Sequence, residues 1–234
     1  MFKIEGNRLF VSFFGIRMKF EINNYFKNKV YISKNGKLKR IYFAPKGLKI
    51  DLLGEGANII LPCGRCFNNV KIIANTNSQI QIQYPHKWSI NSLVLEAGYG
   101  NKIYIGENFN IVSGVFSACG SETEIKIGKD CMFSSNITIM THDGHAIFDV
   151  ASKNALNKPQ SVVVGNHCWF AKNVALIKGA EIQDNTVVGI NSIVNKKIEE
   201  QNCVIAGNPA KVVKSNTNWN RNSYDGYSKN IKEN

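Results

Sequence analysis

The sequence predicts an all-β protein built around a left-handed parallel β-helix of hexapeptide repeats, with a β-rich cap before it. Three observations carry this prediction. Large apolar residues recur every six positions from 164 to 194, the same frame is visible between 105 and 139, and one insertion separates the two runs. A period of six fits neither a helix nor an alternating strand, but it fits short strands joined by tight corners.

The later run consists of six consecutive hexapeptides: VGNHCW, FAKNVA, LIKGAE, IQDNTV, VGINSI and VNKKIE. Their leading residues are Val164, Phe170, Leu176, Ile182, Val188 and Val194. Fifth positions hold mostly small or β-branched residues, and Gly recurs at the second. Three such walls close a triangular coil with the leading residue inside. We expect Gly and Asn to serve the corners, because both tolerate positive φ.

The coils divide the chain into parts. Ile139 and Val164 are separated by one repeat plus 19 residues, which predicts an excluded loop at about 140–161. Aliphatic pairs from Ile59/Ile60 to Ile103/Ile105 predict further, less regular coils upstream. We therefore assign the β-helix to 48–214. Residues 1–47 read as a basic cap with a hairpin turn at Asn35-Gly36. The polar tail 215–234 is expected to be poorly ordered apart from an anchor at Trp219.

Composition indicates an ordinary globular protein, with 44% hydrophobic and 20% charged residues. No run of about 18 apolar residues is present, and the first residues lack the layout of a signal peptide, so we expect a cytoplasmic protein. Its six scattered cysteines are expected to be reduced.

Positive charge is concentrated near the N-terminus. Of the net +12, residues 1–47 contribute +9, from eleven Lys/Arg against two Glu. Such a field attracts an acidic polysaccharide, an anionic membrane surface or nucleic acid; a merely solvated basic surface is the alternative. Nucleic acid is disfavoured as a partner, because no binding module and few interleaved aromatics accompany the charge.

Two sequence features resemble one enzyme family. The segment Ala206-Gly-Asn-Pro-Ala-Lys-Val-Val-Lys214 is similar to the C-terminal signature of hexapeptide-repeat acyltransferases. Asp143-Gly-His145-Ala-Ile-Phe-Asp149, followed by Cys168-Trp169, resembles the branch that O-acetylates bacterial capsule and lipopolysaccharide sugars, including polysialic acid. The resemblance covers about residues 100–214. It implies acetyl-CoA as donor, a homotrimer, clefts between neighbouring coils as active sites, and direct transfer without an acyl-enzyme.

His145 is the candidate general base. A neutral imidazole suits the removal of a proton from a sugar hydroxyl near pH 7. His145 precedes Trp169 by 24 residues, which is the spacing that the family resemblance leads us to expect. His142 competes for the role, or else it bonds loop backbone groups. Asp143 and Asp149 could orient the imidazole or could cap turns.

Trp169 is the second candidate catalytic residue. As the last residue of its hexapeptide it should point out of the core, where its indole N–H could orient the reactants. The alternative is that it fills a trimer interface. The family resemblance places the backbone N–H of Ala171 or Lys172 near the developing oxyanion. His167, at a turn position, reads as structural.

The resemblance also implies residues for coenzyme A. The expected salt partners of its phosphates are Lys196, Lys197, Lys211 and Lys214, with Lys172 nearby, and the expected apolar walls are Ala180, Ile190, Ala206 and Pro209. Any one of these lysines could equally be a solvated surface residue.

No metal site is expected. Cys63-Gly-Arg-Cys66 supplies only two ligands, and nothing nearby completes a tetrahedral set. A zinc site of the γ-class carbonic anhydrase type would have to combine His142, His145 and His167 without a supporting motif. His86, within Tyr84-Pro-His-Lys-Trp88, could contact a sugar acid or could be a cap contact.

Together these features predict an acetyl-CoA-dependent O-acetyltransferase of an anionic, sialic-acid-type surface glycan in a capsule or lipooligosaccharide. The alternatives are an N-acetyltransferase of a nucleotide sugar, an acetyltransferase of a small xenobiotic alcohol and, further away, a non-catalytic β-helix scaffold. The sugar, the hydroxyl and the length of the acceptor are not encoded in the repeat.

Overall fold

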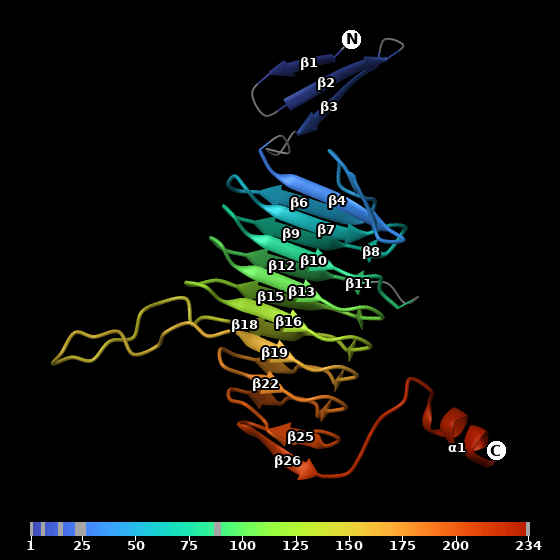
Figure 1. Cartoon of the computed structure of the whole chain (residues 1–234), viewed down its shortest axis with the longest axis vertical. Helices are drawn as coiled ribbons and strands as arrows, with labels where there is room; N and C mark the ends of the chain where they lie inside the picture. Colours follow the sequence, from blue (N-terminus) through green and yellow to red (C-terminus); the bar gives the residue numbers. More distant parts are fainter. Residues whose placement is uncertain (1, 6–7, 14–15, 22–26, 87–89, 233–234) are drawn as a thin grey trace.

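The computed structural model describes residues 2–5, 8–13, 16–21, 27–86 and 90–232, and side chains from 27 onward apart from the last residues of the C-terminal helix. It forms a left-handed parallel β-helix whose coils stack along one long axis (Figure 1). The predicted fold class is confirmed. Within the described residues, no helix is long and apolar enough to cross a lipid bilayer.

Three parallel sheets form the walls of the prism. Face 1 contains β4 (Lys29–Lys34), the antiparallel β5 (Lys37–Arg40), β7 (Asn58–Pro62), β10 (Gln79–Ile82), β13 (Lys102–Ile105), β16 (Glu124–Ile127), β19 (Val162–Val164) and β22 (Glu181–Ile182). Face 2 contains β8 (Phe67–Asn68), β11 (Ile90–Asn91), β14 (Asn110–Ile111), β17 (Met132–Phe133), β20 (Trp169–Phe170), β23 (Val187–Val188), β25 (Val204–Gly207) and the antiparallel β26 (Ala210–Lys214). Face 3 contains β6 (Leu48–Leu52), β9 (Val70–Ala74), β12 (Leu93–Ala97), β15 (Gly114–Ala118), β18 (Ile137–Met140), β21 (Ala175–Leu176) and β24 (Ile193–Val194).

The ends of the chain carry the remaining elements. A separate antiparallel sheet of β1 (Phe2–Glu5), β2 (Arg8–Phe13) and β3 (Ile16–Glu21) lies beyond the first coil (Figure 1). The predicted hairpin at Asn35-Gly36 joins β4 to β5. β4 also pairs in parallel with β7, so the first strand of the solenoid lies inside the segment expected to be the cap. That coil has no six-residue period, which is why the sequence did not place it. The helix α1 (Tyr224–Lys232) ends the described chain.

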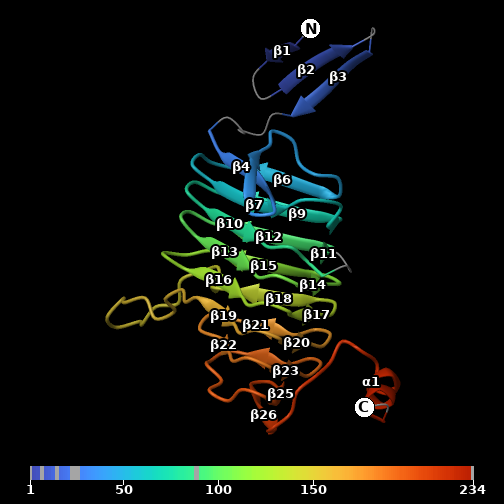
Figure 2. The ribbon, with the colours of Figure 1, turned by 45° about the vertical axis from the view of Figure 1, so that its right-hand side comes forward.

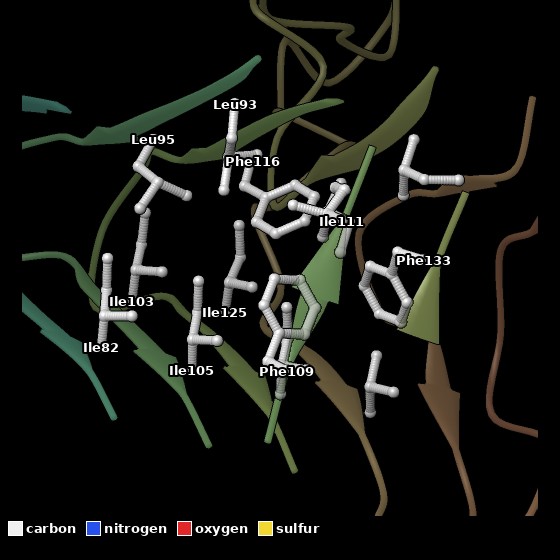
Figure 3. Close-up of a cluster of buried hydrophobic side chains, with 14 of the residues drawn as sticks. Ile82, Leu93, Leu95, Ile103, Ile105, Phe109, Ile111, Phe116, Ile125 and Phe133 are labelled. Carbon is white, nitrogen blue, oxygen red and sulfur yellow. The ribbon is translucent and has the colours of Figure 1, made fainter. Parts of the chain in front are cut away.

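The repeat places its apolar residues as predicted. All six leading residues from Val164 to Val194 are at most 2% exposed, and Thr186 and Ser192 at fifth positions are fully buried as well. Aromatic residues fill the middle coils, where Phe133 stacks on Phe170 with ring centroids 4.0 Å apart. Figure 3 shows this interior, with Phe109, Phe116 and Phe133 among the isoleucines of face 1. The solenoid core is therefore continuous through the site-bearing coils.

The corner residues differ partly from expectation. Asn173, Asn185 and Asn191, all at the fourth position, have φ near +60°, as predicted for corners. The glycines at the second position do not have positive φ, so that part of the prediction is wrong. Gly128 and Gly165 are required by close approach to backbone atoms of the next coil instead. A Cβ built on Gly128 would lie 2.5 Å from the carbonyl oxygen of Gly165 in the next coil.

This contact predicts a stability effect. Gly128→Ala should lower the free energy of unfolding by about 1–3 kcal/mol, because the methyl group must push two stacked backbones apart. Urea denaturation would measure it. Gly226→Ala is the matched control, since a Cβ there meets its nearest atom at 3.4 Å. Equal stability of both variants would contradict the close-approach explanation.

Candidate functional site

The excluded loop spans residues 141–161, between β18 and β19, in agreement with the predicted 140–161. Its two ends are pinned to each other and to the coil before it. Gln160 donates its backbone N–H to the carbonyl of Thr141 at 3.0 Å. The buried Thr141 hydroxyl donates to the carbonyl of Cys119 at 2.7 Å and accepts from its N–H at 2.9 Å. The loop thus leaves the solenoid through a closed neck.

A pocket of about 460 Å³ lies where this loop meets the coil. Cys119 and Gly120 contribute from the coil, and His142 and His145 from the outgoing strand of the loop. The returning strand adds Ala155 and residues 157–159. Both histidines singled out from the sequence therefore lie in one pocket, and their surroundings distinguish them.

His142 has both ring nitrogens engaged. The N–H of Gly144 donates to Nδ1 at 3.0 Å, so the neutral ring carries its proton on Nε2. That Nε2 lies 3.1 Å from the hydroxyl oxygen of Ser117, and the Ser117 hydroxyl donates to the carboxylate of Glu96 at 3.0 Å. The arrangement ties the loop to two successive strands of face 3. It matches the alternative in which His142 bonds loop backbone.

His145 has a different environment. Its side chain is exposed in the pocket, and it makes no side-chain hydrogen bond or ion pair with the part of the chain that the structure describes. Its backbone is fixed instead, since Asn157 Nδ2 donates to the His145 carbonyl at 2.8 Å. A held backbone with an unengaged imidazole suits a group that must accept a proton from a substrate. The geometry favours His145 over His142 as the base, and its role stays a prediction.

Neither candidate carboxylate hydrogen-bonds to a histidine within the described residues. Asp143 pairs with Lys178 and accepts from Asn157 Nδ2 at 2.8 Å, and these hydrogen bonds, that from Lys178 first, hold the pKa of its carboxyl below the usual value. Asp149 accepts from the N–H and hydroxyl of Ser152 and from the N–H of Ala151, which lowers its pKa. Asp149 therefore caps a turn, as one alternative stated.

Trp169 lies on β20 of face 2, with 37% of its surface exposed. It lines a second pocket, of about 880 Å³, which shares no lining residue with the pocket of His145. In Figures 1 and 2 the loop projects from one side of the solenoid, while the C-terminal tail that borders the Trp169 pocket lies on the other side. One chain therefore does not bring His145 and Trp169 together.

The tail contacts the solenoid beside face 2 through Trp219 and Arg221. Trp219, the predicted anchor, is only 8% exposed. Its ring stacks on His167 with centroids 4.4 Å apart, and its indole N–H donates to the His167 carbonyl at 2.7 Å. Arg221 donates to the carboxylate of Asp130 at 3.0 Å and to the carbonyl of Asn108 at 2.9 Å.

His167 joins the tail to the coil, which agrees with its interpretation as a structural residue. Its Nδ1 lies 2.6 Å from the Asp130 carboxylate and its Nε2 lies 3.1 Å from the Trp219 carbonyl. Both neighbours accept hydrogen bonds, so the imidazole can link the coil to the tail through either ring nitrogen. Sequence reasoning missed Asp130 and Arg221, because contacts between residues 91 positions apart leave no periodic signal.

Removing the guanidinium should release the tail. Arg221→Ala deletes hydrogen bonds to the Asp130 carboxylate and to the carbonyls of Asn108 and Cys131, so hydrogen exchange across residues 217–223 should accelerate by about tenfold or more. Mass spectrometry would measure the exchange. The control is Lys229→Ala, in the exposed helix after the anchor. Unchanged protection in Arg221→Ala would contradict the anchoring role.

Acid should have the same effect. Burial of the Asp130 carboxylate acts to raise its pKa, but hydrogen bonds from His167 and Arg221 outweigh burial and leave the pKa lowered. A carboxyl with a lowered folded-state pKa stabilises docking above its ordinary titration range, and this stabilisation is lost as the pH falls through the lowered pKa. Protection of residues 217–223 should therefore fall in that acidic range. Asp130→Asn should remove this pH dependence.

The residues expected to hold coenzyme A lie near the C-terminal coils but not in one pocket. Lys196, Lys197 and Lys211 line a shallow pocket of about 290 Å³, whereas Lys214 lines the Trp169 pocket. Lys197 is paired with Glu199 and Glu181, in that order of influence, and both raise its pKa.

The expected apolar walls are placed unevenly. Ile190 is 60% exposed, and Pro209 and Lys172 are also exposed, whereas Ala206 is half-buried. Ala180 is only 1% exposed because it occupies a fifth position inside the coil. Its methyl group is not available as a wall, so that part of the prediction is corrected.

The remaining sequence candidates form no site of their own. Cys63 and Cys66 are free thiols, and the Cys66 thiol donates to the Cys63 carbonyl at 3.3 Å. Within the described ranges, no group of three or more His, Cys, Asp or Glu could hold a metal ion. His86 and Tyr84 follow β10, but Lys87 and Trp88 of the same motif lie outside the described residues.

Comparison with known proteins settles the family. A polysialic acid O-acetyltransferase of Neisseria meningitidis is 30% identical over 197 residues, which cover 84% of this chain and 77% of that protein. The chain belongs to the hexapeptide-repeat acyltransferases. A second polysialic acid O-acetyltransferase, from Escherichia coli O1:K1 / APEC, is 33% identical over 122 residues, but the match covers only 52% of this acyltransferase chain and 39% of that relative.

Solved structures of this acyltransferase family agree with the fold. The polysialic-acid-specific acetyltransferase NeuO aligns over 79% of this chain and 81% of its own, with a TM-score of 0.60 and 25% identity. The polysialic acid O-acetyltransferase OatWY aligns over 88% and 95%, with a TM-score of 0.53 and 25% identity. No protein-family profile matches the chain.

Proposed function

We propose that this acyltransferase transfers an acetyl group from acetyl-CoA to a hydroxyl of an acidic, sialic-acid-type surface glycan. The observation that carries the proposal is the unengaged imidazole of His145 in the loop pocket. The acceptor class is supported by the Neisseria relative, whose name specifies polysialic acid and which aligns with 84% of this chain.

His145 would perform the proton transfer. As the acceptor oxygen bonds to the acetyl carbonyl carbon, its proton passes to the imidazole, which avoids a high-energy alkoxide. The carbon–sulfur bond of the thioester breaks, and the imidazolium returns the proton to the leaving thiolate. The backbone N–H of Lys172 would bind the developing negative charge, because the N–H of Ala171 already donates to the Val188 carbonyl at 2.9 Å. His142 would hold the loop through Ser117 and Gly144.

The complete site would form between copies of the chain in a homotrimer. His145 and Trp169 lie in separate pockets of one chain. A cyclic trimer repeats one heterologous interface, and that interface can set the loop of one chain against face 2 of its neighbour. The indole N–H of Trp169 would then orient the acceptor or donor beside His145.

The flanking basic residues would bind the two substrates. Lys196 and Lys211 suit the phosphates of coenzyme A, with Lys214 toward the tail. Lys34, Lys37 and Lys39 on the β4–β5 hairpin line a pocket of about 420 Å³ and give a cationic edge for an acidic polymer or an anionic membrane surface. We place the reaction in the cytoplasm.

The test is release of free thiol from acetyl-CoA against oligosialic acid, neutral oligosaccharides, a small alcohol and an amino-sugar nucleotide. Turnover of oligosialic acid at a rate that falls as the salt concentration rises supports the proposal. Turnover of the amino-sugar nucleotide alone would make the protein an N-acetyltransferase. Silence toward every acceptor while coenzyme A still binds would reject the acceptor class.

Mixed trimers test the shared site. His145→Ala and Trp169→Ala chains, each inactive, would be unfolded together and refolded at equal ratio. If each site takes one residue from each of two neighbours, about a quarter of interfaces keep both native residues, and about that share of activity returns. If mixed trimers of confirmed composition recover no activity, the shared site is rejected. Either both residues then act within one chain, or one of them does not belong to the site.

A further inference from the structure

The largest pocket described here, about 880 Å³, lies between face 2 and the docked tail. The solenoid contributes His167, Trp169, Val187 and Val204, and β26 contributes Lys214. The tail forms the opposite wall, with the residues Thr217, Asn218, Trp219, Asn220, Asn222, Ser223, Tyr224 and Tyr227. Trp219 and Arg221 tie the start of this wall to the coil, and the helix α1 with Tyr224 and Tyr227 follows directly after them.

The aromatic residues of this pocket are exposed, unlike the buried apolar residues of the repeat. Tyr224 is 85% exposed, Tyr227 48% and Trp169 37%. They border a hollow, whereas the apolar residues of the repeat are buried in the coils. Exposed aromatic faces that surround a pocket provide surfaces for a ring-shaped ligand with an apolar face.

Its polar groups are mostly donors. The side-chain oxygen of Asn218 accepts from the Trp219 N–H at 2.8 Å, and that of Asn220 accepts from the Asn222 N–H at 2.9 Å. Their amide NH₂ groups therefore remain to face a ligand. Lys214 adds a positive charge, and no Asp or Glu is among the described lining residues. The pocket thus offers donors, one cation and aromatic faces.

We propose that this pocket is a saccharide subsite that binds one residue of an acidic glycan. The sugar ring would stack on the aromatic wall, its carboxylate would lie near Lys214 and its hydroxyls would meet the asparagine amides. This inference rests on the proposed function for the choice of a sialic-acid-type polymer. A nucleotide is the less favoured occupant, because Lys196 and Lys211, the lysines expected to bind coenzyme A phosphates, line another pocket.

The test measures binding without acetyl-CoA. An α2,8-linked sialic acid tetramer would be titrated into the full-length protein by calorimetry, with maltotetraose as the neutral control and adenosine 3′,5′-bisphosphate as competitor. We expect the tetramer to bind and maltotetraose not to bind. The double variant Tyr224→Ala/Tyr227→Ala should weaken tetramer binding about tenfold. Tyr99→Ala, which is 75% exposed outside the pocket, should leave it unchanged.

Asn220→Ala is a second variant that keeps all aromatics, and it should also weaken the tetramer. Binding of the bisphosphate in this pocket without tetramer binding would overturn the proposal in favour of a nucleotide site. Dissociation of the tyrosine variant into monomers, with no tetramer binding by the native trimer, would identify an interface between copies. Acetyl transfer without tetramer binding would overturn the subsite alone, whereas tetramer binding without transfer would overturn the proposed function alone.

Discussion

His145→Ala should lower kcat by about 10²–10⁴-fold, the usual contribution of a positioned general base. Among the described residues the ring makes no side-chain hydrogen bond or ion pair, so its removal should leave the loop, the trimer and coenzyme A binding intact. Thiol release at saturating acetyl-CoA and acceptor would measure the loss. Size exclusion and calorimetry with coenzyme A would check assembly and donor binding.

His142→Gln is the matched control for that variant. Glutamine keeps a donor toward Ser117 but loses the acceptor for the Gly144 N–H, so it should disturb the position of the loop. We expect a smaller fall in kcat than for His145→Ala. If His142→Gln abolishes turnover while His145→Ala retains it, the roles of the two histidines are reversed.

Phe133→Ala should cost about 3–5 kcal/mol in the free energy of unfolding. The ring is fully buried, stacks on Phe170 in the next coil, and contacts the edge of Phe109 with centroids 5.1 Å apart (Figure 3). Its loss leaves a cavity at the point where two coils interlock. Urea denaturation monitored by circular dichroism would measure the effect.

Met132→Ala on the same strand is the matched control. Met132 is only half-buried, because it points away from the coil interior. It should therefore cost far less than Phe133→Ala. Similar losses in the two variants would show that the aromatic stack is not a special source of stability.

The sequence predicted those parts of the fold that depend on a local period. Between Val164 and Val194 a large apolar residue recurs every six positions. Equivalent positions occupy the same wall or corner in successive coils, so the structure of one coil predicts that of the next. The loop was visible as an interruption of that period. β4 was not recognised as a coil strand, because its partner β7 is set by parallel pairing without a hexapeptide.

The candidate site was only partly predictable. His145 could be selected from its motif, but the contacts that engage His142 depend on Ser117 and Glu96 in two earlier coils. The docking of Arg221 on Asp130 is likewise a contact through space. The positions of Trp169 and His145 on different sides follow from the three-fold path of each coil, which a linear motif does not display.

Because the closed neck at Thr141 and Gln160 joins the two ends of the loop, the loop sequence can change without changing how the coils stack. The strands on either side of the loop remain in register with their neighbours, as Ile125 pairs with Val162 and Ile139 with Leu176. Because the neck already brings the loop ends together, lengthening the loop adds little closure entropy and leaves the stack untouched. Loop segments could therefore be exchanged between related enzymes as cassettes, and selection for a new acceptor need not pass through less stable ancestors.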